Sequence, residues 1–175
     1  MKIEVPVLET ARLRMRGHRV DDLADCTAMW GDAGVTRFIG GIPFTVEDVW
    51  ARILRYAGHW AWLEFGPWIV EEKETGRFVG EVGFAEFKRI IHPPLERMPE
   101  IGWVLTPGAQ GLGYATEAAL AAIEWATGRL GPVRTACIIH PDNEPSLRVA
   151  AKCGYAEFAR TVYKGQPTIL LRREG

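Results

Sequence analysis

Three glycines separate a predicted strand from a predicted helix near the middle of the chain. Gly108, Gly111 and Gly113 follow the β-favouring stretch Glu100–Leu105, and an alanine-rich, helix-favouring stretch begins at Ala115. A loop of this kind directs backbone N–H groups and the positive end of a helix dipole toward an anion. Glycines let the ligand come close because they have no Cβ. The stretch therefore predicts a cradle for a phosphate or pyrophosphate group.

Two common phosphate-binding patterns do not fit this loop. A P-loop needs Gly-Lys followed by Ser or Thr, and no Lys follows a glycine here in that pattern. A dinucleotide-binding fingerprint needs a third glycine, and Thr116 occupies that position. It also needs an acidic residue about 20 positions later, where the chain has Arg134 and Thr135. Neither pattern explains the loop.

The pattern that fits is Gln110-x-x-Gly113-x-Ala115. It resembles the acyl-CoA pyrophosphate loop of the GNAT superfamily of N-acyltransferases, which has Arg or Gln, two residues, Gly, one residue, then Gly or Ala. Its surroundings resemble the RimJ/RimL-type branch, although Ala109 stands where that branch usually has an aromatic residue. The opening stretch Leu8–Arg16 also resembles the start of those enzymes.

A second block of sequence resembles the same superfamily. Asn143-x-x-Ser146, followed by Lys152-x-Gly154-Tyr155, matches the family pattern in type and order. In the superfamily the glycine loop binds the CoA pyrophosphate, and the strand before it splays from its neighbour and pairs with the pantetheine arm. The resemblance implies acetyl-CoA as co-substrate, bound by Val104, Leu105, Gln110, Gly111, Leu112, Gly113, Tyr114, Ala115, Thr116, Asn143 and Ser146.

The implied chemistry is direct attack of a primary amine on the thioester in a ternary complex. The ammonium must lose a proton, the oxyanion needs a positioned donor, and the departing thiolate needs an acid. Related enzymes carry a base four residues before the position of Val104, which indicates Glu100, with Glu81 on the neighbouring strand as the rival. The Val104 N–H is the expected oxyanion donor. Many members use a Tyr as the acid, and Ala150 stands at its position. The RimL-like branch uses a Ser of the second block instead, which the resemblance assigns to Ser146, with Tyr114 as a substitute that we rather expect to pack over the cofactor.

The surrounding pattern predicts one α/β domain over residues 1–175. The resemblance implies a GNAT-like fold, with a central mixed, mostly antiparallel sheet of six to seven strands, about four flanking helices, and a splay at the acyl-CoA site. Thr45 with Asp48 three residues later predicts a helix start, and Asn143 predicts another.

Composition excludes several classes of protein. The 175 residues are 47% hydrophobic and carry a net charge of −1, so we expect neither disorder nor a nucleic-acid partner. No apolar stretch reaches membrane-spanning length, and no signal peptide is predicted. The three scattered cysteines, Cys26, Cys137 and Cys153, suit a reducing cytoplasm. No His/Cys cluster has metal-site spacing, so we expect no metal.

The leading interpretation is a cytoplasmic acetyl-CoA-dependent N-acetyltransferase. Its acceptor is a protein N-terminal α-amine or a small-molecule amine, and the sequence does not choose between them. The alternative is a non-catalytic domain that binds acyl-CoA as a sensor. A homodimer is a possible assembly, since members of this superfamily often dimerise.

Overall fold

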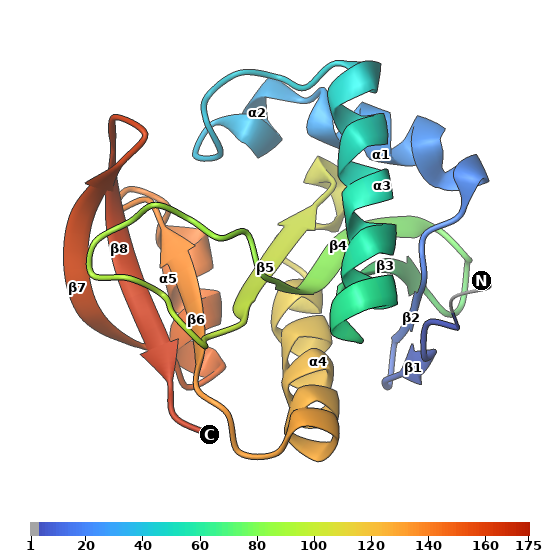
Figure 1. Ribbon diagram of the computed structural model, residues 1–175. Helices are drawn as coiled ribbons and strands as arrows, with labels where there is room; N and C mark the ends of the chain where they lie inside the picture. The colour runs from blue at the N-terminus through green and yellow to red at the C-terminus, as the bar shows by residue number, and fades with distance from the viewer. Residues whose placement is uncertain (1–3) are drawn as a thin grey trace.

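A sheet of eight strands runs through the part of the chain that the computed structural model describes, residues 4–175 (Figure 1). The strand order is β1-β2-β3-β4-β5-β6-β8-β7, and only the β5–β6 pair is parallel. The strands are β1 (Leu8–Glu9), β2 (Leu13–Arg16), β3 (Pro67–Glu72), β4 (Phe78–Ala85), β5 (Glu100–Leu105), β6 (Thr135–Ile139), β7 (Ala156–Tyr163) and β8 (Gln166–Arg173). The helices are α1 (Leu23–Trp30), α2 (Ala33–Thr36), α3 (Val46–Leu63), α4 (Tyr114–Leu130) and α5 (Glu144–Lys152).

The predicted fold class is confirmed. The eight strands and five helices of the described residues slightly exceed the expected six to seven strands and about four helices. Part of the excess comes from β1, a strand of two residues that pairs with β2. Another part is α2, a single turn of four residues in the glycine-rich region after α1. None of the helices in residues 4–175 is both long and apolar enough to cross a membrane.

Helices cover both faces of the sheet and so create two different surfaces. One core cluster joins α1, α2 and α3 to the sheet through buried residues that include Trp30, Ile53 and Ile69. The other core cluster joins α4 and α5 to the opposite face, where small residues such as Ala118 and Ala122 are fully buried. Small side chains let α4 lie close to the strands.

Two helix starts follow the predicted capping chemistry. The Thr45 hydroxyl accepts from the Asp48 N–H, and the Asp48 carboxylate accepts from the Thr45 N–H, which is a complete capping box at the start of α3. The Asn143 side chain accepts from the Ser146 N–H at the start of α5. These caps fix where both helices begin.

Strands β5 and β6 separate soon after they meet. Their ladder holds one register pair, Glu100 with Ala136, and the Ala136 N–H donates to the Pro99 carbonyl at 3.0 Å. Both strands continue beyond this point, to Leu105 and Ile139, while β6 pairs along its length with β8. The predicted splay is therefore present between β5 and β6.

Candidate active site

The glycine loop ends in an open, uncapped helix start. Gly111 and Gly113 have φ values of +76° and +82°, a conformation that favours glycine. A Cβ at Gly111 would meet no atom within 4 Å, so its surroundings are open. Within the described chain no side chain caps the first turn of α4. The backbone N–H groups of that turn are available to bind an anion.

An ion pair between Arg12 and Glu117 anchors this loop to the N-terminal part of the chain. The Glu117 carboxylate accepts from the Thr10 hydroxyl at 2.6 Å, from the Arg12 N–H at 2.9 Å and from Arg12 Nε at 2.7 Å. Arg12 Nη1 donates to the Leu112 carbonyl at 2.9 Å. Burial alone would raise the pKa of Glu117, but these hydrogen bonds hold it below its ordinary value. The turn between β1 and β2 thus positions the loop, a contact that no local sequence pattern predicts.

The predicted loop residues differ in their exposure to solvent. Leu112 is 48% exposed, whereas Tyr114 is 6% exposed. The Tyr114 hydroxyl donates to Glu72 Oε1 at 2.5 Å, and the Arg12 guanidinium lies 4.5 Å from the centre of its ring. The Tyr114 side chain therefore points into the protein. Its N–H, with those of Ala115 and Thr116, belongs to the uncapped first turn.

The hydrogen-bond pattern of the β4–β5 ladder decides which way each β5 amide points. The Thr106 N–H donates to the Val79 carbonyl at 3.0 Å, just past the end of the ladder. Hydrogen-bonded and non-hydrogen-bonded pairs alternate along an antiparallel ladder. The Val104–Glu81 pair lies two positions from the Thr106–Val79 pair, so its backbone groups are also hydrogen-bonded between β5 and β4. The Val104 N–H, expected as the oxyanion donor, therefore points toward β4.

The amides of Trp103 and Leu105 face the splay instead. The same alternation directs them away from β4, and two contacts agree with it. The Pro99 carbonyl, on the same side of β5, accepts from Ala136 of β6. The Leu105 carbonyl accepts from the Gln110 side chain at 3.1 Å. A chain of pantetheine type lying in the splay would meet these two amides.

The second sequence block lies across the splay from β5. The Trp103 indole N–H donates to Ser146 Oγ at 3.2 Å, joining β5 to the first turn of α5. The Ser146 hydroxyl proton is still available to another acceptor, because the indole uses only an oxygen lone pair. The Asn143 carbonyl oxygen caps the helix, which leaves its NH₂ group as a donor. The structure therefore brings the two predicted blocks together.

Glu100 is held in a bidentate ion pair. Its two oxygens accept from Arg89 Nε at 2.6 Å and from Arg89 Nη2 at 2.7 Å. Arg89 Nη1 also donates to the Tyr163 hydroxyl at 3.3 Å. Glu100 is 8% exposed. To accept a proton from a substrate, its carboxylate would first have to give up part of this pair.

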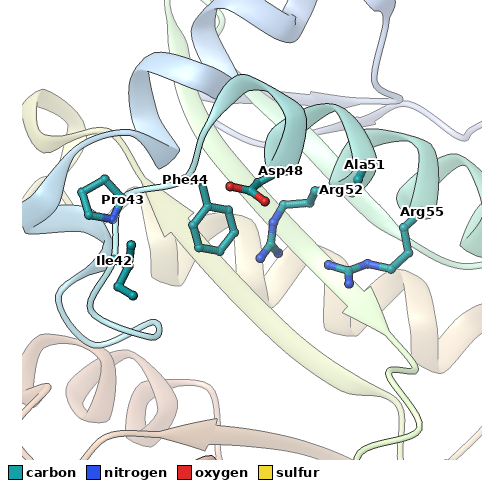
Figure 2. Close-up of a pocket in the computed structure, with 7 residues that line it drawn as sticks. All are labelled: Ile42, Pro43, Phe44, Asp48, Ala51, Arg52 and Arg55. Atoms are coloured by element: carbon teal, nitrogen blue, oxygen red, sulfur yellow. The ribbon is translucent and has the colours of Figure 1, made fainter.

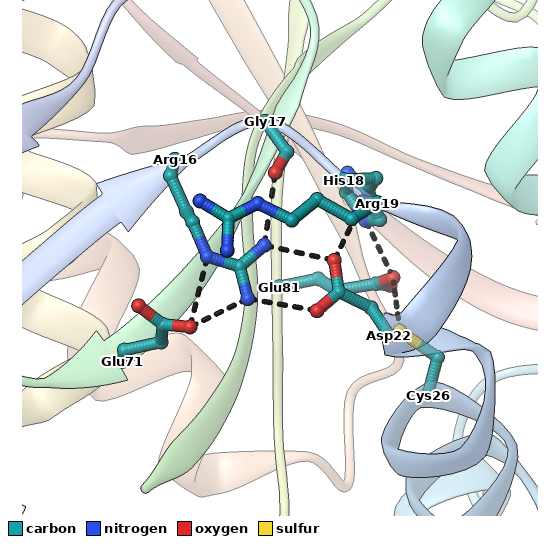
Figure 3. A network of polar contacts seen from close by, with 8 residues as sticks. All are labelled: Arg16, Gly17, His18, Arg19, Asp22, Cys26, Glu71 and Glu81. Atoms are coloured by element: carbon teal, nitrogen blue, oxygen red, sulfur yellow. Dashed lines mark hydrogen bonds and ion pairs between the residues drawn. The ribbon is translucent and has the colours of Figure 1, made fainter. Parts of the chain in front are cut away.

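Glu81 is more deeply buried and is bonded to an indole, a thiol and an imidazole. It is 3% exposed, and its Oε2 accepts from the Trp30 indole N–H at 2.8 Å. Its Oε1 lies 2.8 Å from His18 Nε2 and accepts from the Cys26 thiol at 3.4 Å (Figure 3). Burial, and then the Glu81 charge, raise the pKa of Cys26, so the thiol stays protonated. His18 Nδ1 is buried and has no hydrogen-bond partner in residues 4–175.

A buried ion cluster positions the segment that carries His18. The Arg16 guanidinium donates to both oxygens of Asp22, at 2.8 Å and 2.7 Å, and to Glu71 (Figure 3). The hydrogen bond to Asp22, opposed by burial, raises the pKa of Arg16. Burial alone would raise the pKa of Asp22, but hydrogen bonds from Arg16 and the Arg19 N–H lower it. The cluster joins β2 and β3 to the turn before α1.

Open space lies over the sheet between the two candidate bases. A Cβ at Gly102 would meet no atom within 4 Å. Gly102 lies on β5 between Glu100 and Val104, on the face that Glu81 shares. An amine in this space would approach the splay from the side opposite Ser146. The geometry thus separates a candidate base from a candidate acid.

His18, Cys26 and Glu81 form the one group of possible metal ligands within residues 4–175. Their ligand atoms lie within 4.8 Å of one another. The hydrogen bonds among the three residues and Trp30 already account for their approach. The expected absence of a metal therefore stays a prediction.

A comparison with protein families agrees with this geometry. The profile of the family described as "Acetyltransferase (GNAT) domain" matches residues 12–156. The chain belongs to the GNAT acetyltransferase family. An uncharacterized N-acetyltransferase of Bacillus subtilis, YnaD, is 30% identical over 161 residues, covering 90% of this chain and 89% of its own. An acetyltransferase structure from Agrobacterium tumefaciens has a TM-score of 0.84 at 25% identity, covering 100% of this chain and 98% of its own.

More distant GNAT structures share the fold alone. RimL, the ribosomal L7/L12 alpha-N-protein acetyltransferase, solved with coenzyme A, has a TM-score of 0.76 at 13% identity, over 97% of this chain and 98% of its own. The GNAT membership supports an acyl-CoA-dependent acetyltransferase. Sequence reasoning had found the loop and the second block of this GNAT chain. The roles of Arg12, His18 and Trp30 are not predicted by the sequence, because these residues lie far from both motifs. Arg12 belongs to a Thr-x-Arg pattern, and the other two are an isolated titratable residue and an isolated aromatic residue.

Proposed function

We propose that this protein transfers the acetyl group of acetyl-CoA directly to a primary amine in a ternary complex. The observation that carries the proposal is the single-pair β5–β6 ladder, which opens beside an uncapped glycine loop. A pantetheine arm needs unpaired strand amides, and a pyrophosphate needs the N–H groups of a helix start. Both lie at the end of β5.

We propose that the Trp103 and Leu105 N–H groups bind the cofactor, one of them stabilising the oxyanion. Their direction toward the splay supports this role. The Val104 N–H, expected from the family resemblance, remains an alternative donor only if that part of the ladder opens on binding. The proposed pyrophosphate contacts stay those of the loop and the first turn of α4, from Gln110 to Thr116.

For the general base we favour Glu81 over Glu100. Both flank the open space at Gly102, but the two oxygens of Glu100 are bonded to a permanent cation. The partners of Glu81 are an indole, a thiol and an imidazole, and His18 Nε2 can exchange a proton with it. A carboxylate in such surroundings can take the proton of an ammonium through water.

Ser146 is the proposed acid for the departing thiolate. Its hydroxyl is oriented by the Trp103 indole, and it lies on the α5 side of the splay, opposite the proposed base. The thiolate leaves toward the cofactor side, so an acid is needed there. Asn143 is proposed to bind the cofactor next to it through its NH₂ group.

The branch and setting of the enzyme are also proposals. The opening stretch and both motifs support a RimJ/RimL-like enzyme of the cytoplasm, with a protein N-terminal α-amine or a small amine as acceptor. No metal is required for this chemistry, and neither nucleic acid nor membrane is an expected partner. A homodimer remains a possible assembly.

The test is release of coenzyme A thiol from acetyl-CoA across a panel of amines and N-terminal peptides. Amine-dependent release, with the acetylated product identified by mass spectrometry, is the expected result. Calorimetry of acetyl-CoA binding accompanies it. Tight binding without release for any amine or acyl chain would favour the alternative, a non-catalytic acyl-CoA sensor. Absence of binding would reject both functions.

A further inference from the structure

An open pocket of about 410 Å³ lies beside α3, on the face of the sheet that carries Glu81 (Figure 2). Its walls are the loop at residues 42–44 and one side of α3. Figure 2 shows Arg52 and Arg55 extending from successive turns of α3 to the side on which Phe44 lies. The one carboxylate that lines it, Asp48, is used by the capping box of α3.

Arg52 is partly buried and forms no ion pair in residues 4–175, although the charge of Asp48, one turn earlier on α3, acts on it from a longer distance. Its guanidinium lies 4.0 Å from the Trp30 ring centre and 4.8 Å from that of Phe44. Its Nη1 donates to the Tyr56 hydroxyl at 2.8 Å, while its Nε is buried and has no partner in the described chain. No carboxylate of residues 4–175 pairs with it within 4.0 Å. A buried donor without an acceptor is costly, so the guanidinium of Arg52 is incompletely satisfied by the protein.

Arg55, an exposed residue, adds a second positive charge to the same pocket. Its guanidinium lies 5.0 Å from the centre of the Phe87 ring and forms no ion pair in the described chain. Desolvation, and then the charge of Arg52, lower the pKa of Arg55. Like charges three residues apart on a helix repel each other. The two residues are therefore held together at a cost in stability.

Two other partly buried arginines of this protein, Arg16 and Arg89, are paired with carboxylates. Arg16 is bonded to Asp22 and Glu71, and Arg89 is bonded to Glu100. The general rule is that buried charges are paired. Arg52 departs from this rule, and Arg55 places a second positive charge at the same pocket, so the pocket favours an anionic ligand.

The pocket is connected to the proposed reaction site through one side chain. Arg52 stacks on the indole of Trp30, and the N–H of the same indole donates to Glu81 Oε2 at 2.8 Å. Phe44 stacks on the Trp30 ring, and the two ring centres are 5.0 Å apart. Val104 packs against the same group of residues. A ligand bound to these arginines would therefore be separated from Glu81 by the Trp30 side chain.

We propose that the acceptor is a primary amine that also bears a carboxylate, of the size of a free amino acid, and that Arg52 and Arg55 bind this carboxylate. This assignment rests on the proposed acetyl transfer, and it deepens it by naming the acceptor class. Guanidinium groups recognise carboxylates through paired N–H donors. A polycationic amine would meet like charge in this pocket.

The test compares each L-amino acid with its own C-terminal amide as acceptor, with spermidine and O-phosphoethanolamine as references. For each amino acid we divide the kcat/KM of the free acid by that of its amide. We then compare this ratio between the wild type and three variants, Arg52→Gln, Arg55→Gln and Arg52→Lys. The comparison between proteins cancels the intrinsic reactivity of each amine. For the best amino acid we expect the ratio to fall about tenfold or more in each glutamine variant, through KM. Arg129→Gln, at the far end of α4, is the matched control and should keep the wild-type ratio.

A binding experiment separates failure of this inference from failure of the proposed function. Calorimetry measures the same amino acids against the complex of the protein with coenzyme A, whether or not turnover occurs. Weakening of about tenfold in Arg55→Gln would support the carboxylate site even without turnover. An unchanged acid-to-amide ratio in both glutamine variants, preference for spermidine or O-phosphoethanolamine over every amino acid, or no amino-acid binding in the absence of turnover would overturn it.

Discussion

Glu81 of β4 lies directly opposite Val104 of β5, so the most deeply buried carboxylate of the candidate site shares a sheet face with the end of the splayed strand. Side chains of directly opposite residues are close neighbours on one face. Glu100 lies on the same strand as Val104 but four residues earlier, which is roughly 13 Å along an extended chain. Register thus distinguishes two carboxylates that the sequence presents as rivals.

The first prediction separates these two bases. Glu81→Gln keeps an oxygen that can accept from the Trp30 indole but removes the basic carboxylate, so we expect kcat to fall by about 10²- to 10⁴-fold with acetyl-CoA affinity unchanged. Glu100→Gln breaks the pair with Arg89 and is expected to act mainly on thermal stability. Steady-state kinetics and calorimetry of both variants provide the test. A larger loss of kcat in Glu100→Gln would restore Glu100 as the base.

The second prediction concerns the proposed acid. Ser146→Ala removes the hydroxyl but neither the Asn143 cap nor the helix, so kcat should fall by about tenfold to a hundredfold while acetyl-CoA affinity stays within about twofold. Trp103→Phe, which removes the indole donor together with part of the ring, should give a smaller loss. Pre-steady-state release of thiol measures both. If Ser146→Ala kept the wild-type rate, the serine would be a helix-start residue without an acid role.

The third prediction tests the anion cradle. Gly113→Asp places a side chain and a negative charge at a residue with φ of +82°, beside the uncapped start of α4. We expect acetyl-CoA binding to weaken by at least about a hundredfold, since bulk and charge both oppose the pyrophosphate. Gly131→Asp is the control for backbone strain, because it lies at the other end of α4 and its φ of +79° with ψ of −169° is a conformation at least as restricted to glycine. Equal calorimetric affinity for the two variants would contradict the assignment.

The fourth prediction concerns the buried cluster at Arg16. Asp22→Asn leaves part of the guanidinium charge uncompensated, and we expect a loss of about 3 kcal/mol in the free energy of unfolding. Asp25→Asn, an exposed neighbour on α1, should change it by less than about 0.5 kcal/mol. Urea unfolding at pH 7 measures both values. A difference of less than about 1 kcal/mol between the variants would show that the cluster contributes little.

The same cluster makes stability depend on pH in a defined direction. The pKa of Asp22 is lower in the folded protein than its ordinary value. Its contribution is therefore complete above the unfolded pKa of about 4, and it is lost as pH falls through the lower folded pKa. Wild-type stability should fall more steeply than that of Asp22→Asn below about pH 4. Parallel slopes in urea unfolding would argue against this linkage.

The sequence alone determined the fold class and the two blocks that face the splay. Local chemistry explains this success, because a glycine loop, a helix cap and a β-favouring run each act within a few residues of the chain. Thr45, Asn143 and the stretch from Gln110 to Ala115 could be interpreted without knowing what lies around them. The family resemblance then supplied their order.

Only the tertiary structure decided which way the backbone N–H groups point and which distant residues contact each other. The hydrogen-bond alternation of the β4–β5 ladder directs the Val104 N–H inward, and no local pattern specifies that register. Glu81 and His18 are 63 residues apart, and Glu117 lies 105 residues from Arg12. Arg52 likewise has no visible role until Trp30 lies against it. Such contacts depend on packing between distant segments, which is why the sequence named candidate residues while the fold set their partners.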